Sequence, residues 1–281
     1  MDSFVFAAVL AAAAAHAGWN AVIKGGLEPF AMMVLITLGA GIASLALMPV
    51  VGLPAAASWP WVAASVVVHF FYSIGLIGAY RAGDMGQVYP LARGAAPVMT
   101  AMISTTWLAE PLGPVGWCGL LLLVAGVVIL SLRGGGDLVR LDRRAIGYAL
   151  FTAVTICAYS IVDGVGARTA GNASAYAVTL FAGIGIVMAA YAMVLRGPQV
   201  FVAMAPFWRR GVGGGAMQMV SYWIAIWAMT VAPIALVAAL RETSVLFGAL
   251  IAVVILKEPL RAARVVAALM IVAGLAAMRL A

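Results

Sequence analysis

The sequence predicts an all-α integral membrane protein, and three observations lead to this class. The chain has 281 residues, of which 66% are hydrophobic and 9% are charged, and its mean hydropathy is +1.14. No soluble domain has enough interior to bury so many apolar side chains. Apolar stretches of about 18 to 25 residues, each long enough to cross a hydrocarbon core of roughly 30 Å, recur between short breaks. Because backbone amides find no partner in lipid and the stretches lack the alternation of barrel strands, they are expected to be helices.

Ten such spans are expected along the chain. They cover residues 3–23, 30–51, 60–80, 85–108, 114–132, 145–167, 174–195, 212–230, 234–256 and 262–280. The breaks between them carry Gly, Pro and charged residues, which are typical of connections. Ala15-His16-Ala17 resembles the cleavage site of a signal peptide, but such a peptide begins with basic residues and the only early charge here is Asp2. The first stretch is therefore interpreted as a membrane span.

The second half of the chain repeats the first. Residues 79–132 align with residues 227–280 without a gap at a shift of 148. The matches are Leu108, Glu110, Pro111 and Leu112 with Leu256, Glu258, Pro259 and Leu260, Val124-Ala125-Gly126 with Val272-Ala273-Gly274, and Arg93 with Arg241. Because each copy has five spans, an odd number, the second copy enters the membrane from the opposite face. The expected architecture is two inverted five-helix repeats, residues 1–136 and 137–281, around a site at their interface.

The net charge of +7 indicates topology rather than a nucleic-acid partner. Twelve of the 16 basic residues fall in the connections after spans one, three, five, seven and nine, whereas the opposite side has only Arg168 and Arg279. Cytoplasmic loops are enriched in Lys and Arg. The odd-numbered connections are therefore expected in the cytoplasm and both termini in the periplasm.

These features resemble a known family. Ten spans, a five-plus-five duplication and a Leu-x-Glu-Pro-Leu segment at 108–112 and 256–260 resemble the EamA-type members of the drug/metabolite transporter superfamily. Within it, the chain is similar to bacterial inner-membrane exporters of amino acids, including the aromatic amino acid exporters. The resemblance implies a basket of ten helices whose central cavity is lined by spans one, three, four, six, eight and nine, with the last span of each half peripheral. It fixes the substrate poorly, because related members export different metabolites.

Polar and aromatic side chains concentrate in those same spans, often at helical spacing, as for His16, Trp19 and Asn20. Spans two, five, seven and ten are nearly featureless and are expected to face lipid or to pack. The expected substrate-binding residues are His16, Trp19, Asn20, His69, Tyr72, Tyr80, Tyr89, Arg93, Tyr159, Asp163, Gln218, Tyr222, Trp223, Arg241 and Glu242. The alternative for the aromatic residues is an anchoring belt at the membrane interface.

No metal or other cofactor is expected. The two histidines, His16 and His69, could form a metal pair, but no carboxylate or thiolate accompanies them at ligand spacing, so hydrogen bonding in a cavity wall is the favoured interpretation. Charged residues inside a span face the protein interior or a wet cavity by default. A bound amino acid needs a cation for its carboxylate and an acceptor or an aromatic face for its ammonium group. Arg241, Asn20, Glu242 and the Trp and Tyr residues are candidates for these roles. The alternative is that Arg241 and Glu242 pair with groups on neighbouring helices and hold the bundle together.

Candidate hinges lie in two spans. Pro90 and Pro97 interrupt span four, and Pro breaks a helical hydrogen bond. Gly213, Gly214 and Gly215 open span eight, where the alternative is close helix packing.

The predicted function is that of a secondary transporter that exports small amphipathic metabolites, amino acids first, by alternating access. The sequence has no phosphate-binding Gly-Lys-Ser/Thr loop, so no ATPase subunit is required, and one chain is large enough to enclose a pathway as a monomer. Facilitated diffusion and proton exchange both remain open, the latter through His16, His69, Asp163 or Glu242. The alternatives are efflux of drugs or other metabolites, or an intramembrane enzyme. An enzyme is disfavoured because the sequence has neither a Gly-x-Ser-x-Gly elbow nor a His-Glu-x-x-His pair.

Overall fold

The computed structural model describes residues 1–23, 27–82, 85–132, 143–254 and 262–280, and every regular element in these ranges is a helix. Seven of the described helical segments are long and apolar enough to cross a membrane. The chain is therefore an all-α, membrane-embedded protein, as its composition predicts. The predicted Glu-Pro-Leu segment at 258–260 and the Gly run at 134–136 lie outside the described residues.

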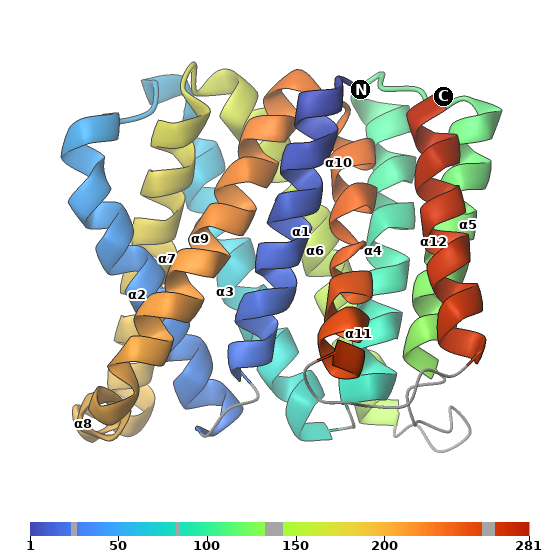
Figure 1. The fold of residues 1–281 in the computed structure, drawn as a ribbon. Coiled ribbons are helices and arrows are strands. Elements are labelled where there is room, and N and C mark those ends of the chain that lie inside the picture. Colours follow the sequence, from blue (N-terminus) through green and yellow to red (C-terminus); the bar gives the residue numbers. More distant parts are fainter. Residues whose placement is uncertain (24–26, 83–84, 133–142, 255–261, 281) are drawn as a thin grey trace.

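The helices run roughly side by side, and both chain termini lie at the same end of the bundle (Figure 1). The long helices are α1 (Ser3–Ile23), α2 (Pro29–Val51), α3 (Trp59–Ala82), α4 (Met85–Trp107), α5 (Pro114–Leu132), α6 (Arg143–Thr169), α7 (Ala173–Arg196), α9 (Trp208–Val231) and α12 (Ala262–Leu280). The shorter ones are α8 (Gln199–Met204), α10 (Ile234–Arg241) and α11 (Ser244–Val254), with single turns η1 (Ala56–Ser58) and η3 (Ala205–Phe207).

Local sequence sets several of these boundaries. Pro29 occupies the first turn of α2, where its missing N–H costs nothing. The side chain of Asn172 caps α7 by accepting from the backbone N–H groups of Ser174 and Ala175 at 3.0 and 3.2 Å. Gly52 and Gly197 follow α2 and α7 with φ of +82° and +67°, which glycine adopts without a Cβ penalty.

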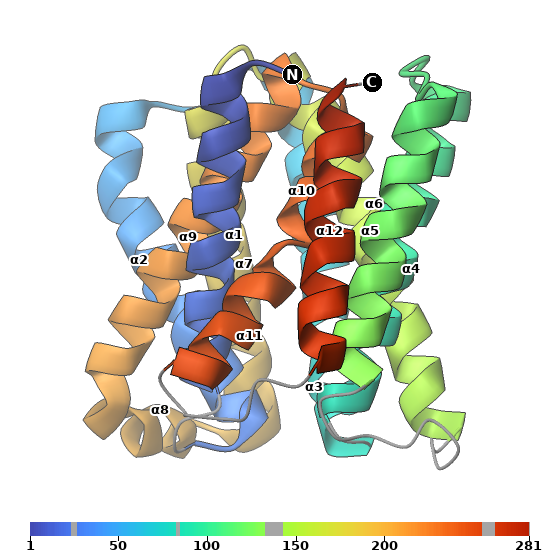
Figure 2. The ribbon, with the colours of Figure 1, turned by 45° about the vertical axis from the view of Figure 1, so that its right-hand side comes forward.

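The predicted span 234–256 is interrupted, which the sequence reading did not anticipate. A turn at Glu242 and Thr243, here called the 242–243 turn, separates α10 from α11, and Figure 2 shows α11 slanting away from the direction of α10. In this turn the bonds tighten to i→i−3: the Glu242 and Thr243 N–H groups donate to Ala239 and Leu240. The Thr243 hydroxyl also donates to the Leu240 carbonyl at 2.7 Å. The turn therefore replaces part of the normal helical ladder with local bonds.

Helices from the two halves of the chain pack against each other. The principal partners are α1 with α9, α3 with α6, α2 with both α7 and α9, α5 with α12, and α4 with α6. Small residues let the backbones of α5 and α12 approach closely: a Cβ on Gly119 would lie 2.7 Å from the Gly274 carbonyl oxygen, and one on Gly126 would lie 2.8 Å from that of Ala267.

Each end of the bundle is tied by one carboxylate. At the end opposite the termini, Glu28 pairs with Arg196 at the end of α7 and with Arg81 at the end of α3. At the end of the termini, Glu110 pairs with Arg168 of α6 at 2.6 Å and accepts from the backbone N–H of Ile234, the first residue of α10, at 2.9 Å. The Glu of the repeated Leu-x-Glu-Pro-Leu segment thus caps a helix of the other half.

The glycines that were candidate hinges differ in their surroundings. A Cβ on Gly215 would lie 2.6 Å from the backbone nitrogen of Ala40, whereas one on Gly213 would meet nothing within 4 Å. Gly214 is buried within the same helix, α9. Pro97 lies within α4, which continues past it to Trp107. Gly215 therefore meets a packing requirement, and Gly213 has none.

We expect Gly215→Ala to lower the melting temperature of the purified protein clearly, because overpacking against backbone costs about 1–3 kcal/mol. Gly213→Ala, two residues away on the same helix, is the matched control and should melt as the wild type or slightly above it. Tryptophan-fluorescence melting in detergent measures both. Equal melting temperatures for the two variants would contradict the packing described here.

A second prediction concerns Glu28, which lies outside the membrane-spanning segments. The guanidinium groups of Arg196 and Arg81 lower the pKa of Glu28 from 4.5 to about 2. Because the folded-state pKa is depressed, the stabilisation is complete above pH 4.5 and is lost as the pH falls toward 2. Glu28→Gln should melt slightly below the wild type at pH 7, and the difference should shrink at pH 3. A difference that stays constant over this range would contradict the assignment.

Candidate functional site

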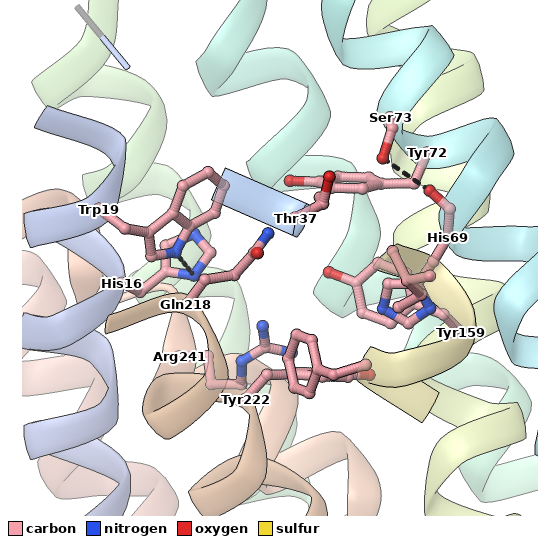
Figure 3. A pocket seen from close by; sticks show the side chains of 12 residues that line it. His16, Trp19, Thr37, His69, Tyr72, Ser73, Tyr159, Gln218, Tyr222 and Arg241 are labelled. Atoms are coloured by element: carbon pink, nitrogen blue, oxygen red, sulfur yellow. Dashed lines mark hydrogen bonds between the residues drawn. The ribbon is translucent and has the colours of Figure 1, made fainter. Parts of the chain in front are cut away.

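A cavity lies among the central helices, and its wall is mainly aromatic (Figure 3). The empty space around the lining residues is about 470 Å³, part of it open to solvent. The lining residues are His16 and Trp19 of α1, Thr37 of α2, His69, Tyr72 and Ser73 of α3, Tyr159 of α6, Phe181 and Ile184 of α7, Gln218 and Tyr222 of α9, and Arg241 of α10.

Eight of the predicted substrate-binding residues are therefore brought together. The sequence reading missed Thr37, Ser73, Phe181 and Ile184. The expectation that spans two and seven only face lipid or pack is wrong, because α2 and α7 contribute to the wall. Thr37 gave a faint signal as a polar residue in an apolar stretch, but Phe181 and Ile184 gave none.

Arg241 is the cation of this cavity. Its side chain is only 6% exposed, and its guanidinium carbon lies 4.6 Å from the centre of the Tyr222 ring. Arg241 forms no ion pair with any residue that the structure describes, and its Nε has no hydrogen-bond acceptor there. A buried charge without a counter-ion is costly. The site is therefore suited to an anionic group that supplies the missing partner.

Arg93 and Glu242, both predicted to bind substrate, lie outside the lining and pair with each other. Arg93 Nε lies 2.8 Å from a Glu242 carboxylate oxygen, and both side chains are almost fully buried. Arg93 also donates to the Ser244 hydroxyl at 2.9 Å and to the Arg241 carbonyl at 3.4 Å. These are groups of the 242–243 turn, so Arg93 stabilises the interruption between α10 and α11. The alternative role weighed for Glu242, holding the bundle together, describes this pair.

Asp163 also lies behind the wall rather than in it. Its fully buried carboxylate accepts from the Tyr176 hydroxyl at 2.9 Å and from the Tyr222 hydroxyl at 2.5 Å. Two contacts therefore fix the Tyr222 side chain: its hydroxyl donates to Asp163, and the Arg241 guanidinium lies over its ring. Asp163 positions a residue of the wall, which differs from the predicted direct contact.

The two histidines have different hydrogen-bonding surroundings. Trp19 Nε1 donates to His16 Nδ1 at 3.3 Å, so this nitrogen is an acceptor. His69 Nδ1 lies 3.0 Å from the Ser65 carbonyl oxygen and 3.1 Å from the Ser65 hydroxyl oxygen, so it can donate to the first or accept from the second. The His69 ring stacks on Tyr159 at 4.4 Å between centroids. On the opposite side of the cavity in Figure 3, Gln218 presents an Oε1 that has no hydrogen-bond partner among the described residues.

The remaining predicted site residues are not brought to the cavity. The Asn20 amide donates to the His16 carbonyl at 2.8 Å, and Trp223 Nε1 donates to the Ser174 hydroxyl at 2.9 Å. Neither residue is part of the lining. The side chains of Tyr80, Tyr89 and Pro90 lie outside the described residues. No group of three His, Cys, Asp or Glu side chains that could hold a metal ion occurs within the described ranges.

Comparison with known proteins identifies the fold but no family. No protein-family model matches the chain, and no curated protein matches it. A solved structure described only as "Crystal structure of protein" matches with a TM-score of 0.79 over 99% of this chain and 96% of the other, at 20% sequence identity. This likeness shows that the fold occurs among solved structures, and it says nothing about activity.

The buried ion pair gives a testable prediction. Glu242→Gln removes the carboxylate of the buried pair with Arg93, and breaking such a pair costs about 3–5 kcal/mol, so the melting temperature should fall clearly. The double variant Arg93→Met/Glu242→Leu removes both charges and should recover part of that loss. Thermal melting of the two variants and the wild type in detergent measures this. Wild-type stability of Glu242→Gln would show that the pair does not hold the helices.

Proposed function

We propose that this protein is a secondary transporter that exports small amphipathic metabolites by alternating access, with amino acids as the leading candidate substrates. The observation that carries the proposal is Arg241, a buried guanidinium in the wall of an aromatic cavity among membrane helices, which forms no ion pair within the described part of the chain. A carboxylate would complete it with charge-assisted hydrogen bonds.

The rest of the wall matches the other parts of an amino acid. The unpartnered Gln218 Oε1 can accept from an ammonium group, and the aromatic faces of Trp19, Tyr72 and Tyr159 attract a cation and pack against an apolar side chain. Efflux of cationic drugs, the competing candidate within the same family, fits less well because Arg241 would repel a cation.

The proposal includes ten spans in two inverted repeats, residues 1–136 and 137–281, as in EamA-type members of the drug/metabolite transporter superfamily. The contacts between α5 and α12 support it. The shift of 148 takes residue 119 to 267 and residue 126 to 274, and it is 119 that meets 274 and 126 that meets 267. Each contact therefore maps onto the other when the halves are exchanged, as a two-fold axis requires. Arg93 and the Arg241 carbonyl, also 148 residues apart, meet in the same way.

We place the protein in a bacterial inner membrane with the connections at the Glu28 end in the cytoplasm. Arg81, Arg196 and Arg209 are found at this end, whereas Arg168 and Arg279 are found at the end of the two termini (Figure 1). This distribution follows the enrichment of basic residues on the cytoplasmic side.

Counterflow into proteoliposomes tests the proposal. Radiolabelled L-phenylalanine and L-leucine should exchange saturably, whereas ethidium and a nucleotide sugar should not. Arg241→Gln should lower amino acid exchange at least about tenfold, because a hydrogen bond to a charged group contributes about 1.5–3 kcal/mol. Arg209→Gln, an exposed arginine beside Trp208, is the matched control and should keep the wild-type rate.

A competitor identifies the group that Arg241 recognises. Phenylalanine methyl ester keeps the ammonium group and the ring but lacks the carboxylate, so it should inhibit wild-type exchange weakly. Wild-type exchange by Arg241→Gln, or equal inhibition by phenylalanine and its ester, would contradict carboxylate recognition at this residue.

A further inference from the structure

The Nε2 atom of His69 is a candidate acceptor in the cavity, because its lone pair can bind a proton or accept a hydrogen bond from a substrate. His69 Nδ1 lies within hydrogen-bond distance of both the carbonyl and the hydroxyl oxygen of Ser65. In the neutral tautomer whose Nδ1–H donates to the Ser65 carbonyl, Nε2 carries a lone pair. Nε2 accepts no hydrogen bond from any residue that the structure describes. Because His69 belongs to the wall, this acceptor is available to an ammonium group in the cavity.

His69 and Arg241 are close enough to bind the two ends of one amino acid. The Arg241 guanidinium carbon lies 4.6 Å from the Tyr222 ring centre, and the His69 ring centre lies 5.3 Å from the same point. The two groups are thus no farther apart than the sum of these distances. The ammonium and carboxylate groups of an α-amino acid share one carbon atom, and each adds a hydrogen bond of about 2.7–2.9 Å to its protein partner. One molecule can therefore contact both residues.

Three other buried titratable groups, His16, Glu242 and Asp163, already use the atom that a proton would occupy in a hydrogen bond or an ion pair. His16 already accepts from Trp19 on Nδ1 and experiences the positive charges of Arg93 and Arg241, so a proton there would break a bond and add a third positive charge. Glu242 forms an ion pair with Arg93, and the Asp163 carboxylate accepts hydrogen bonds from two tyrosine hydroxyls behind the cavity wall.

The groups around His69 come from four helices. Its own helix contributes Tyr72, α6 contributes the stacked Tyr159 and the carboxylate of Asp163, α9 contributes Tyr222, and α10 contributes Arg241. The negative charge of Asp163 offsets the positive charge of Arg241 at this ring.

We propose that a proton and the substrate ammonium group compete for Nε2 of His69, so that the cavity holds one or the other and export of the substrate is exchanged for a proton. When the substrate binds, the Nε2–H bond of the imidazolium breaks, the proton leaves to water in the cavity, and an ammonium N–H donates to the freed lone pair. When a proton returns, the imidazolium repels the ammonium group. This coupling rests on the proposed function.

The test is the pH dependence of L-phenylalanine binding to the purified protein between pH 5.5 and 7.5, together with proton release recorded by an indicator dye. Wild-type affinity should fall on acidification, by up to tenfold per pH unit, and binding at low pH should release up to one proton per phenylalanine. His69→Gln keeps an acceptor oxygen but does not titrate, so its affinity should be independent of pH. His16→Gln is the matched control and should keep the wild-type slope whatever its affinity.

The outcomes separate the two proposals. Wild-type binding that is independent of pH and releases no proton would overturn the coupling and leave the proposed function intact, and a His69→Gln variant that keeps the pH slope would do the same. Absence of amino acid binding to the wild type at every pH would remove both. Because the chain has two histidines, His16→Gln also leaves His69 as the sole imidazole for ¹⁵N NMR. There, phenylalanine should shift the ring from imidazolium to neutral at low pH even if His69→Gln fails to fold, and an unchanged spectrum would overturn the coupling.

Discussion

The cavity depends on the buried ion pair between Arg93 and Glu242, which stabilises the 242–243 turn. In a membrane, an interrupted helix must satisfy the backbone groups that it frees, since lipid offers no hydrogen bonds. Arg93 does this by donating to the Arg241 carbonyl and the Ser244 hydroxyl while it neutralises Glu242. Neighbouring residues on a helix point about 100° apart. The Glu242 carboxylate thus pairs with Arg93 behind the wall, whereas the neighbouring Arg241 guanidinium faces the cavity and forms no ion pair with a described residue.

Tyr222 links the charges that surround the cavity. Its hydroxyl donates to Asp163, its ring lies beneath the Arg241 guanidinium, and its edge meets His69. One tyrosine of α9 therefore contacts His69 of α3, Asp163 of α6 and Arg241 of α10. Tyr222 therefore joins helices from both halves of the chain at the wall of the cavity.

The sequence predicted the helical membrane class and most of the aromatic wall, because both follow from apolar length and from the one-sided placement of polar residues. His16 and Trp19 were found in this way, being three residues apart on one helix face. The contributions of Phe181 and Ile184 were not predictable, since apolar residues on an apolar helix look the same whether they face lipid or a cavity. The 242–243 turn was missed because the residue that contacts and stabilises it, Arg93, lies far earlier in the chain, on α4.

The ties at the two ends of the bundle differ in strength, and this difference bears on how a central site could open to each side. Glu28 and its partners Arg81 and Arg196 keep 38–53% of their side-chain surface exposed, and exposed pairs of this kind contribute about 0–1 kcal/mol each. Glu110 is 14% exposed, and it also caps α10, while Arg168 donates to two further backbone carbonyls. Separating α3 from α7 at the Glu28 end breaks these exposed ion pairs and the contact between the Phe70 and Tyr191 rings, whereas separating α6 from α10 at the other end removes a helix cap. Among the described residues, the Glu28 ion pairs are thus more exposed than the Glu110 pair at the end of the two termini.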